Sequence, residues 1–282
     1  MPRAAGLRFD LVVATVERTN ALTALLGSLE AQTHRGFRVI VVDQNPDDRI
    51  AAVLAEHSAL DVLHLRSDCG LSRARNAALP ELTADVVAFP DDDCVYPPTL
   101  LERVAGRFAA DAGLAGLTGT AADADGRRDA SWATEEATLD DGNLWNRVIS
   151  FAIFLRRDVV ERVGRFDERL GLGAGTPWSS GEEVDYLLRA IESGARIQYD
   201  PNLVVQHAIK GYDRRALRAV GFRDGASVGW ILRRHRYGPG TLARMLVRPL
   251  GGIALSLARG DLTRASFHGA TLRGRIRGYL SR

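Results

Sequence analysis

The sequence of 282 residues has little cysteine and no long hydrophobic run. Its two cysteines, Cys69 and Cys94, are too few for a disulfide framework, and this usage is typical of a reducing cytosol. The first twenty residues turn polar after a short apolar run, so we expect no secretory signal peptide. No stretch reaches the roughly 20 apolar residues that span a bilayer. The longest candidate, residues 245–258, is interrupted by Arg248, Pro249 and two glycines.

Charge is unevenly distributed along the chain, although the formal net charge is only +2. Residues 209–282 contain 16 Lys and Arg but only 3 Asp and Glu, a net charge of +13, which leaves −11 for residues 1–208. A basic tail of this kind predicts an anionic partner. Its aromatic residues are sparse and no nucleic-acid motif is present, so we expect an anionic membrane surface and no nucleic acid. Packing of the tail on the acidic body is the alternative.

Strand and helix patterns alternate in the first half. Four continuous apolar runs are typical of strands that are buried on both faces, at Phe9–Thr15, Phe37–Asp43, 61–67 and 84–90. This order predicts an α/β protein with an open, doubly wound sheet. Ligands of such sheets bind beyond the carboxyl ends of the strands, where Thr15, Asp43 and Asp91 fall. Beyond residue 212 the pattern is helical and rich in arginine.

Three consecutive carboxylates, Asp91, Asp92 and Asp93, follow the fourth predicted strand. Clustered hard oxygen ligands suit a divalent cation such as Mg²⁺ or Mn²⁺. Mg²⁺ usually takes one or two carboxylates and completes its shell with water and phosphate oxygens, so a metal here would also grip a phosphate group. The alternative is that the aspartates cap a helix or lie in a solvated turn.

Two further segments carry candidate residues. Gly70 opens a helical pattern that contains Arg73 and Arg75, which suits a phosphate as well as it suits a solvated helix. Residues 178–190 begin with Trp178, which would stack on a sugar or pack in a core. Three acidic residues follow at a predicted helix start, namely Glu182, Glu183 and Asp185. They would either stabilise the positive end of the helix dipole or include a general base. His207, at the end of a later strand, suits a structural role or a metal site.

Taken together, the order of these motifs resembles the family 2 glycosyltransferases over about residues 8–210. The likeness rests on Thr15, Asp43, "GLSRARNAAL", "DDD", "GEEVDYLLRAIESGARI" and the following His207. It implies the GT-A fold, a Rossmann-like mixed and mostly parallel sheet flanked by helices. It also implies metal-dependent transfer from a nucleotide sugar with inversion. We therefore expect a transferase domain at 1–210 and a basic helical segment at 211–282.

The resemblance also implies roles for individual residues. Nucleotide binding would fall to Thr15, Glu17, Asp43, Arg73, Arg75, Asp91 and Asp92. Metal binding would fall to Asp93 and His207. Glu183 would be the catalytic base, with Glu182 supporting it or binding the acceptor, and Trp178 and Asp185 would line the acceptor site. The divalent cation would be Mn²⁺ or Mg²⁺.

Three segments depart from the family pattern. The first strand ends in Ala14-Thr15-Val16-Glu17 rather than Pro-Thr-Tyr-Asn, and the second is followed by Asp43-Gln44-Asn45-Pro46 rather than Asp-Asp-Gly-Ser. Both changes fall in the segments that would contact the base. The usual Glu-Asp pair is Glu182-Glu183, which leaves Glu182, Glu183 and Asp185 as alternatives for the base.

The expected function is transfer of a hexosyl or deoxyhexosyl group to a saccharide or lipid-linked acceptor, in the synthesis of cell-surface polysaccharide or glycolipid. The expected location is the cytoplasm, with peripheral contact on the inner face of the membrane. A sugar-phosphate nucleotidyltransferase is the alternative enzyme, although residues 15–20 lack the glycine-rich loop of that class. A catalytically degenerate membrane scaffold is the alternative without catalysis.

Overall fold

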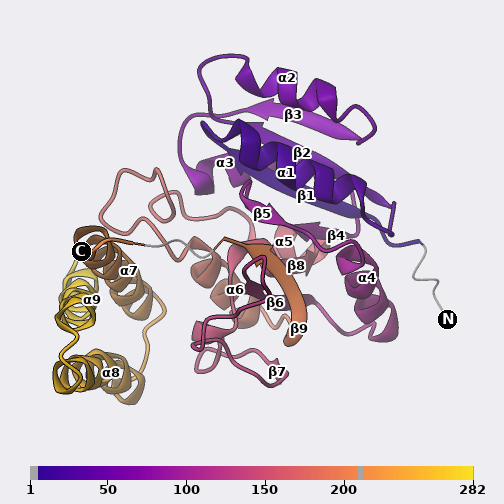
Figure 1. Cartoon of the computed structure of the whole chain (residues 1–282). Helices are drawn as coiled ribbons and strands as arrows, with labels where there is room; N and C mark the ends of the chain where they lie inside the picture. The colour runs from indigo at the N-terminus through magenta and orange to yellow at the C-terminus, as the bar shows by residue number, and fades with distance from the viewer. Residues whose placement is uncertain (1–5, 209–211, 282) are drawn as a thin grey trace. The chain divides into compact units, whose positions relative to one another are not determined.

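The computed structural model describes residues 6–208 and 212–281, and the chain packs as two compact units (Figure 1). The first comprises Met1–Phe166 and Tyr186–Ile209, and the second comprises Asp167–Asp185 and Lys210–Arg282. The division into domains at residue 210 stays a prediction. The units differ from it in one respect, because residues Asp167–Asp185 group with the C-terminal helices.

The first unit is built on one mixed sheet. Its strands are β1 (Phe9–Thr15), β2 (Phe37–Asp43), β3 (Val62–Arg66), β4 (Val86–Ala88), β5 (Cys94–Val95), β6 (Gly116–Ala122), β7 (Ala137–Thr138), β8 (Ile153–Arg156) and β9 (Ile197–His207). Its helices are α1 (Thr19–Glu30), α2 (Arg49–Glu56), α3 (Leu71–Ala78), α4 (Leu100–Ala110) and α5 (Arg157–Val163), with short 3₁₀ turns at η2 (Leu79–Glu81), η3 (Leu144–Asn146) and η4 (Ser150–Ala152). Helix α6 (Glu182–Glu192) begins in the second unit and continues into the first.

The strand order is β3-β2-β1-β4-β8-β6-β9-β5, and β7 pairs with β9. Strands β1 to β4 pair in parallel, as the four apolar runs predict. Strand β8 runs antiparallel to both β4 and β6, and β5 runs antiparallel to β9. Strands β6 and β9 pair in parallel, so the longest ladders of the sheet are parallel ones. The sheet is therefore mixed and mostly parallel, and the predicted α/β class is confirmed.

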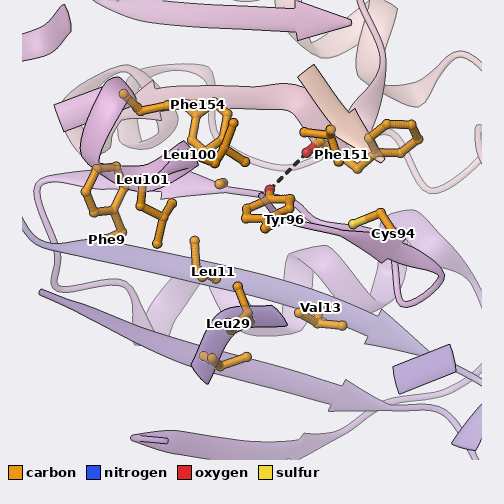
Figure 2. Packing of buried hydrophobic residues seen from close by; sticks show 14 of the residues in the cluster. Phe9, Leu11, Val13, Leu29, Cys94, Tyr96, Leu100, Leu101, Phe151 and Phe154 are labelled. Carbon is orange, nitrogen blue, oxygen red and sulfur yellow. Dashed lines mark hydrogen bonds between the residues drawn. The ribbon is translucent and has the colours of Figure 1, made fainter. Parts of the chain in front are cut away.

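The continuous apolar runs arise because both faces of the central strands are covered. On one face, β1 places Phe9, Leu11 and Val13 in a core that includes Leu29 of α1 (Figure 2). Val12 alternates with them and points to the opposite face, where α3 contacts β1, β2 and β3.

Figure 2 also shows how this core reaches the segment after the acidic triplet. Tyr96 is buried among apolar side chains, and its hydroxyl donates a hydrogen bond of 2.9 Å to the backbone oxygen of Phe151. A buried hydroxyl must find such a partner to offset its lost hydration. The bond ties the chain beyond β5 to η4, so the triplet is fixed by a packed core at its C-terminal side.

Three long helices make up most of the second unit, α7 (Arg214–Arg234), α8 (Pro239–Ala258) and α9 (Leu262–Leu280). Helices α7 and α9 pack backbone against backbone. Added Cβ atoms at Gly225 and Gly229 would collide with the backbone of Thr271 and Arg275, and one at Gly278 would collide with Ala226. Small residues four apart allow such a close approach, which explains the glycine spacing in both helices.

Helix α8 is exposed along much of its length. Val247, Leu250, Leu255 and Leu257 are at least 49% exposed. By length and composition alone the helix could cross a membrane, with a mean hydropathy of 1.2 over 18 residues, of which 17% are buried. Arg248 and Pro249 interrupt the apolar run, but the helix is still long and apolar enough to cross a membrane.

Candidate active site

The first carboxylate of the acidic triplet lies directly beside the end of β1. Asp91 forms an isolated parallel bridge with Ala14. Its Oδ1 atom lies 3.2 Å from Nη2 of Arg75, and it accepts a hydrogen bond of 3.1 Å from the hydroxyl of Ser150. Asp91 remains partly exposed, with 28% of its side chain accessible, so it can still receive a hydrogen bond from a ligand.

The second carboxylate is held by the loop after β1. Asp92 is buried, and it accepts hydrogen bonds from Oγ1 of Thr15 at 2.8 Å and from Nη1 of Arg18 at 2.9 Å. Burial raises the pKa of Asp92, while Thr15 and Arg18 act in the opposite direction. Both oxygens of this carboxylate therefore have hydrogen-bond partners within the protein, and the bond from Thr15 joins the triplet to β1. The predicted contact of Asp92 with the nucleotide stays a prediction.

The third carboxylate lies between a guanidinium and an imidazole. Asp93 accepts a bond of 2.7 Å from Nη1 of Arg18, and its Oδ1 atom lies 3.1 Å from Nε2 of His207. Cys94 pairs with His207 across β5 and β9, and this pairing brings the side chain of the preceding residue, Asp93, next to that of His207. His207 stacks on Phe151 with ring centroids 4.9 Å apart, so its ring orientation is fixed.

The donor set at Asp93 is small for a divalent cation. Within residues 6–208 and 212–281, no group of three or more His, Cys, Asp or Glu side chains could hold a metal ion by itself. A cation that arrives with a diphosphate needs fewer protein ligands, since phosphate and water oxygens complete its shell. One carboxylate and one imidazole in contact fit that kind of site, and they match the two predicted ligands.

The loops after β1 and β2 form a cross-linked rim beside the triplet. Asp43 is fully buried, and its Oδ1 atom accepts bonds from the backbone and side-chain nitrogens of Asn45 at 2.8 and 2.7 Å. Asn45 in turn accepts a bond of 2.8 Å from the backbone N–H of Glu17. Glu17 is exposed and has a φ of 60°. The hydrogen bond to Asn45 thus stabilises the left-handed backbone conformation of Glu17, which residues other than glycine rarely adopt.

The two predicted phosphate-binding arginines have different environments. Arg75 is buried, with its guanidinium carbon 5.7 Å from the ring centroid of Phe89 and 5.5 Å from that of Phe166. Arg73 is exposed, and it donates to the backbone oxygen of Cys69 at 2.8 Å. Arg75 is therefore a fixed part of the Asp91 environment, whereas Arg73 lies at the surface of α3.

The remaining candidates lie in the second unit. Asp185 is fully buried, and its Oδ1 atom lies 3.0 Å from both Nε of Arg234 and Nε2 of His235. Trp178 stacks on Trp230 of α7, with ring centroids 6.1 Å apart. Asp185 therefore anchors the start of α6 to α7.

The two glutamates at the start of α6 differ in exposure. Glu182 is 5% exposed, while Glu183 is more accessible. Both stand in the first turn of the helix, where the backbone N–H groups have no partner within the helix. The segment before them is fixed to α7 by a hydrogen bond of 3.0 Å between the hydroxyls of Ser180 and Ser227.

Two residues that contact the triplet are not indicated by any pattern in the sequence. Arg18 lies three residues after the end of the first predicted strand, and nothing in the surrounding sequence indicates its contacts with Asp92 and Asp93. Ser150 is 59 residues from Asp91 in the chain and reaches it only through the pairing of β4 with β8.

Comparison with known proteins relates the chain to one family. The profile described as "Glycosyl transferase family 2" matches residues 10–164, more than half of the chain. "Pre-mycofactocin glycosyltransferase" of Mycobacterium tuberculosis is 29% identical over 290 residues, covering 88% of this chain and 58% of that protein. The chain thus spans less than two thirds of that relative. "Succinoglycan biosynthesis protein ExoM" of Rhizobium meliloti is 24% identical, covering 88% of this chain and 78% of that protein.

Solved structures show the same fold. The mannosyltransferase PcManGT from Pyrobaculum calidifontis, in complex with GDP-Man and Mn²⁺, superposes with a TM-score of 0.67 at 16% identity, over 97% of this chain and 87% of that one. TarS 1-349 of S. aureus, in complex with UDP-GlcNAc, gives a TM-score of 0.60 at 15% identity, over 94% and 90%. The fold is therefore the predicted GT-A fold, and the predicted C-terminal helices are present.

Proposed function

The chain belongs to glycosyl transferase family 2, and from this membership we propose that it transfers a sugar from a nucleoside-diphosphate sugar to a hydroxyl group of an acceptor. The observation that carries the proposal is the arrangement at the strand ends of the first unit. Asp91 and Asp93 present carboxylate oxygens from one turn, with Arg75 beside the first and His207 beside the second. This set suits a nucleotide whose ribose and diphosphate carry hydroxyl groups and negative charge.

Each residue of this set has a proposed part in donor binding. Asp91 accepts hydrogen bonds from the ribose, and Arg75 holds that carboxylate in place. Thr15 and Asp43, with the backbone near Glu17, shape the rim on which the base rests, and Arg73 meets the nucleotide from the surface of α3. Support comes from the solved neighbours with GDP-Man and with UDP-GlcNAc, which are nucleotide sugars.

The residues that would hold a divalent cation are Asp93 and His207, with Mn²⁺ or Mg²⁺ as the ion. When bound, such a cation stabilises the negative charge that develops on the departing nucleoside diphosphate. Asp92 contributes by fixing the turn, since Thr15 and Arg18 occupy its oxygens. The PcManGT complex, which contains Mn²⁺ together with GDP-Man, supports this choice of metal.

We assign the catalytic base to Glu183, with Glu182 as the alternative. Asp185 is buried and paired with Arg234 and His235, so it is poorly suited to exchange a proton with an acceptor. In the proposed reaction, the base takes the proton of the acceptor hydroxyl while the oxygen attacks the anomeric carbon from the face opposite the diphosphate. One displacement of this kind inverts the anomeric configuration. Trp178 belongs to the acceptor side.

A sugar-phosphate nucleotidyltransferase is less well supported. That reaction needs a loop that cradles a triphosphate, and the loop between β1 and α1 (residues 16–18) is Val16-Glu17-Arg18, without glycine. Incubation with a sugar 1-phosphate and a nucleoside triphosphate would reveal that activity through release of pyrophosphate. Release of nucleoside diphosphate from a sugar nucleotide would exclude the catalytically degenerate scaffold, because only an active enzyme produces it.

The experiment that tests the function is nucleotide-dependent thermal stabilisation followed by assay. We expect UDP or GDP to raise the melting temperature in the presence of Mn²⁺, and the corresponding sugar nucleotide to yield free diphosphate. Asp93→Asn should abolish the metal-dependent part of the shift. Asp125→Asn is the matched control, because Asp125 is exposed and pairs only with a surface arginine in the described contacts. If neither diphosphate stabilises the protein with or without Mn²⁺, the proposal is wrong.

We also propose that the second unit contacts an anionic membrane surface. Helix α8 exposes Val247, Leu250 and Leu257, and arginines flank them at positions 244, 248 and 259. Apolar side chains beside basic ones are typical of helices that lie in the membrane interface. Peripheral contact with the membrane would place the enzyme near an acceptor used for cell-surface polysaccharide or glycolipid.

A further inference from the structure

The second unit contains a groove of about 850 Å³. All of its lining residues belong to this unit, and they come from the loop before α6, from α7 and from α9. They are Trp178, Phe222, Arg273, Ile276, Arg277, Leu280 and Ser281. The groove combines a cationic wall with an apolar wall, and its lining residues include no carboxylate.

The cationic wall consists of two arginines one helical turn apart on α9. Arg273 and Arg277 are both exposed, and neither side chain makes an ion pair or hydrogen bond with the described part of the chain. Two guanidinium groups without acidic partners leave an uncompensated positive charge on one face of a helix. Arginine recognises phosphate oxygens in a bidentate manner, so a phosphate group is the anion that best suits this pair.

The apolar wall lies beside this pair. Phe222, Ile276 and Leu280 are 37%, 44% and 70% exposed, which leaves hydrophobic surface uncovered. Trp178 lines the groove as well, but its Nε1 atom is shielded from solvent, so the side chain offers apolar ring surface to a ligand.

The groove and the proposed base belong to the same unit, and a short segment of the chain connects them. Trp178 precedes Glu182 by four residues, and the intervening segment is fixed to α7 through the Trp178–Trp230 stack and the Ser180–Ser227 hydrogen bond. Gly181 approaches α7 so closely that an added Cβ would lie 2.8 Å from Cδ1 of Ile231. A molecule held in the groove is thereby kept near the start of α6.

We propose that this groove binds the acceptor of the transferase, and that the acceptor is an amphiphile in which a phosphate ester joins an apolar chain to a head group that carries the attacking hydroxyl. The phosphate pairs with Arg273 and Arg277, and the chain follows Phe222, Ile276 and Leu280. The inference rests on the proposed transferase function and names its acceptor class. We infer that the groove binds this acceptor rather than bulk phospholipid, because Arg273 and Arg277 line it together with Trp178, which lies in the segment that leads into Glu182 and Glu183.

The proposal is tested by titrating the full-length protein with decyl phosphate below its critical micelle concentration. Binding is followed through the fluorescence of Trp178, identified by loss of the signal in Trp178→Phe. We expect decyl maltoside and inorganic phosphate to bind at least tenfold more weakly than decyl phosphate, because each carries only one of the two features. Equal binding of decyl maltoside would overturn the proposal.

Two double variants locate the site. Arg273→Gln with Arg277→Gln should weaken decyl phosphate binding at least tenfold, since two charge-assisted contacts are lost. Arg214→Gln with Arg218→Gln removes the same charge at the same spacing from α7, outside the groove, and should leave the affinity within twofold. Unchanged binding in the first double variant would show that the groove is not the site.

Two further measurements separate the alternatives. Both double variants should keep the nucleotide-dependent thermal shift. If the unchanged protein shows no nucleotide-dependent shift, the donor proposal is wrong. The titration with decyl phosphate still tests the groove in that case. Both should also float with anionic vesicles as the unchanged protein does. Loss of flotation in the Arg273 and Arg277 variant alone would overturn the assignment to an acceptor, since the groove would then hold bulk lipid.

Discussion

Arg18 carries a positive charge between Asp92 and Asp93, with Nη1 2.9 Å from an oxygen of the first and 2.7 Å from an oxygen of the second. Partial burial acts to lower the pKa of its guanidinium, but the two carboxylates outweigh this effect and raise the pKa. The side chain is 42% exposed and can swing away. It therefore relieves the repulsion within the triplet and competes with any other cation for Asp93.

Replacing Arg18 should strengthen metal binding. In Arg18→Gln, the affinity for Mn²⁺ in the presence of UDP or GDP should rise about two- to fivefold, the worth of a partly exposed ion pair. Free Mn²⁺ measured by electron paramagnetic resonance reports this without an activity assay. Arg49→Gln is the control, because Arg49 pairs with Asp47 at the surface. A lower affinity in Arg18→Gln would mean that Arg18 supports the metal site instead.

The buried position of Arg75 predicts a large effect on stability. Arg75→Met should lower the free energy of unfolding by about 3 kcal/mol, because it leaves Asp91 without its cation and disturbs the packing between Phe89 and Phe166. Arg73→Met, two residues away on the same helix, should change it by less than about 0.5 kcal/mol, since Arg73 is exposed. Urea denaturation of the two variants decides. Equal losses would contradict the assigned environments.

At the level of elements, the sheet could be predicted well because its signal is local. The runs at Phe9–Thr15 and Phe37–Asp43 are apolar at every buried position except Asp10, Thr15 and Asp43, and the structure confirms both strands with the same limits. The contacts of the strand ends could not be predicted, since they join distant segments. Thr15 and Asp92 are 77 residues apart, and nothing in either segment identifies the other as its partner.

The same limit explains why the sequence does not assign residues 167–185 to the second unit. Residues 167–185 look like a glycine-rich loop of the transferase domain, yet they pack with the C-terminal helices through the Asp185 ion pairs and the stacked tryptophans. The pairing of α7 with α9 likewise depends on glycines in two separate helices, and each set has meaning only once the other helix is present.

Glycines in the second unit should therefore differ sharply in their tolerance of substitution. Gly225→Val should unfold the α7–α9 pair, because its Cβ would enter the backbone of Thr271. Gly251→Ala in α8, where nothing lies within 4 Å, should raise stability by up to about 1 kcal/mol through helix propensity. Circular dichroism during heating, with limited proteolysis of residues 212–281, tests both. If Gly225→Val kept the unchanged melting curve, the close packing would be refuted.

At the scale of the whole molecule, charge and exposed apolar surface coincide in the sequence. The net charge of residues 209–282 is +13, and the same stretch carries α8 with its exposed leucines. The proposed nucleotide-sugar site lies in the acidic part of the chain, and the exposed leucines lie in the basic part, residues 209–282. This arrangement suits an enzyme that takes its donor from solution and its acceptor from a membrane surface. The charge split thus agrees with the proposal that the donor and an anionic membrane surface bind to different parts of the chain.

Flotation with lipid vesicles tests the tail at this scale. The protein should float with vesicles that contain phosphatidylglycerol at low salt, since each basic residue near such a surface adds about 1 kcal/mol. It should float less at about 0.5 M salt, where charges are screened over a few ångströms. Leu250→Gln with Leu257→Gln should reduce flotation severalfold by removing two apolar contacts on one face of α8, whereas Leu172→Gln, an exposed leucine of the loop before α6, should not. Protein that stays in the bottom fraction with anionic vesicles would mean that α8 is covered by something other than lipid.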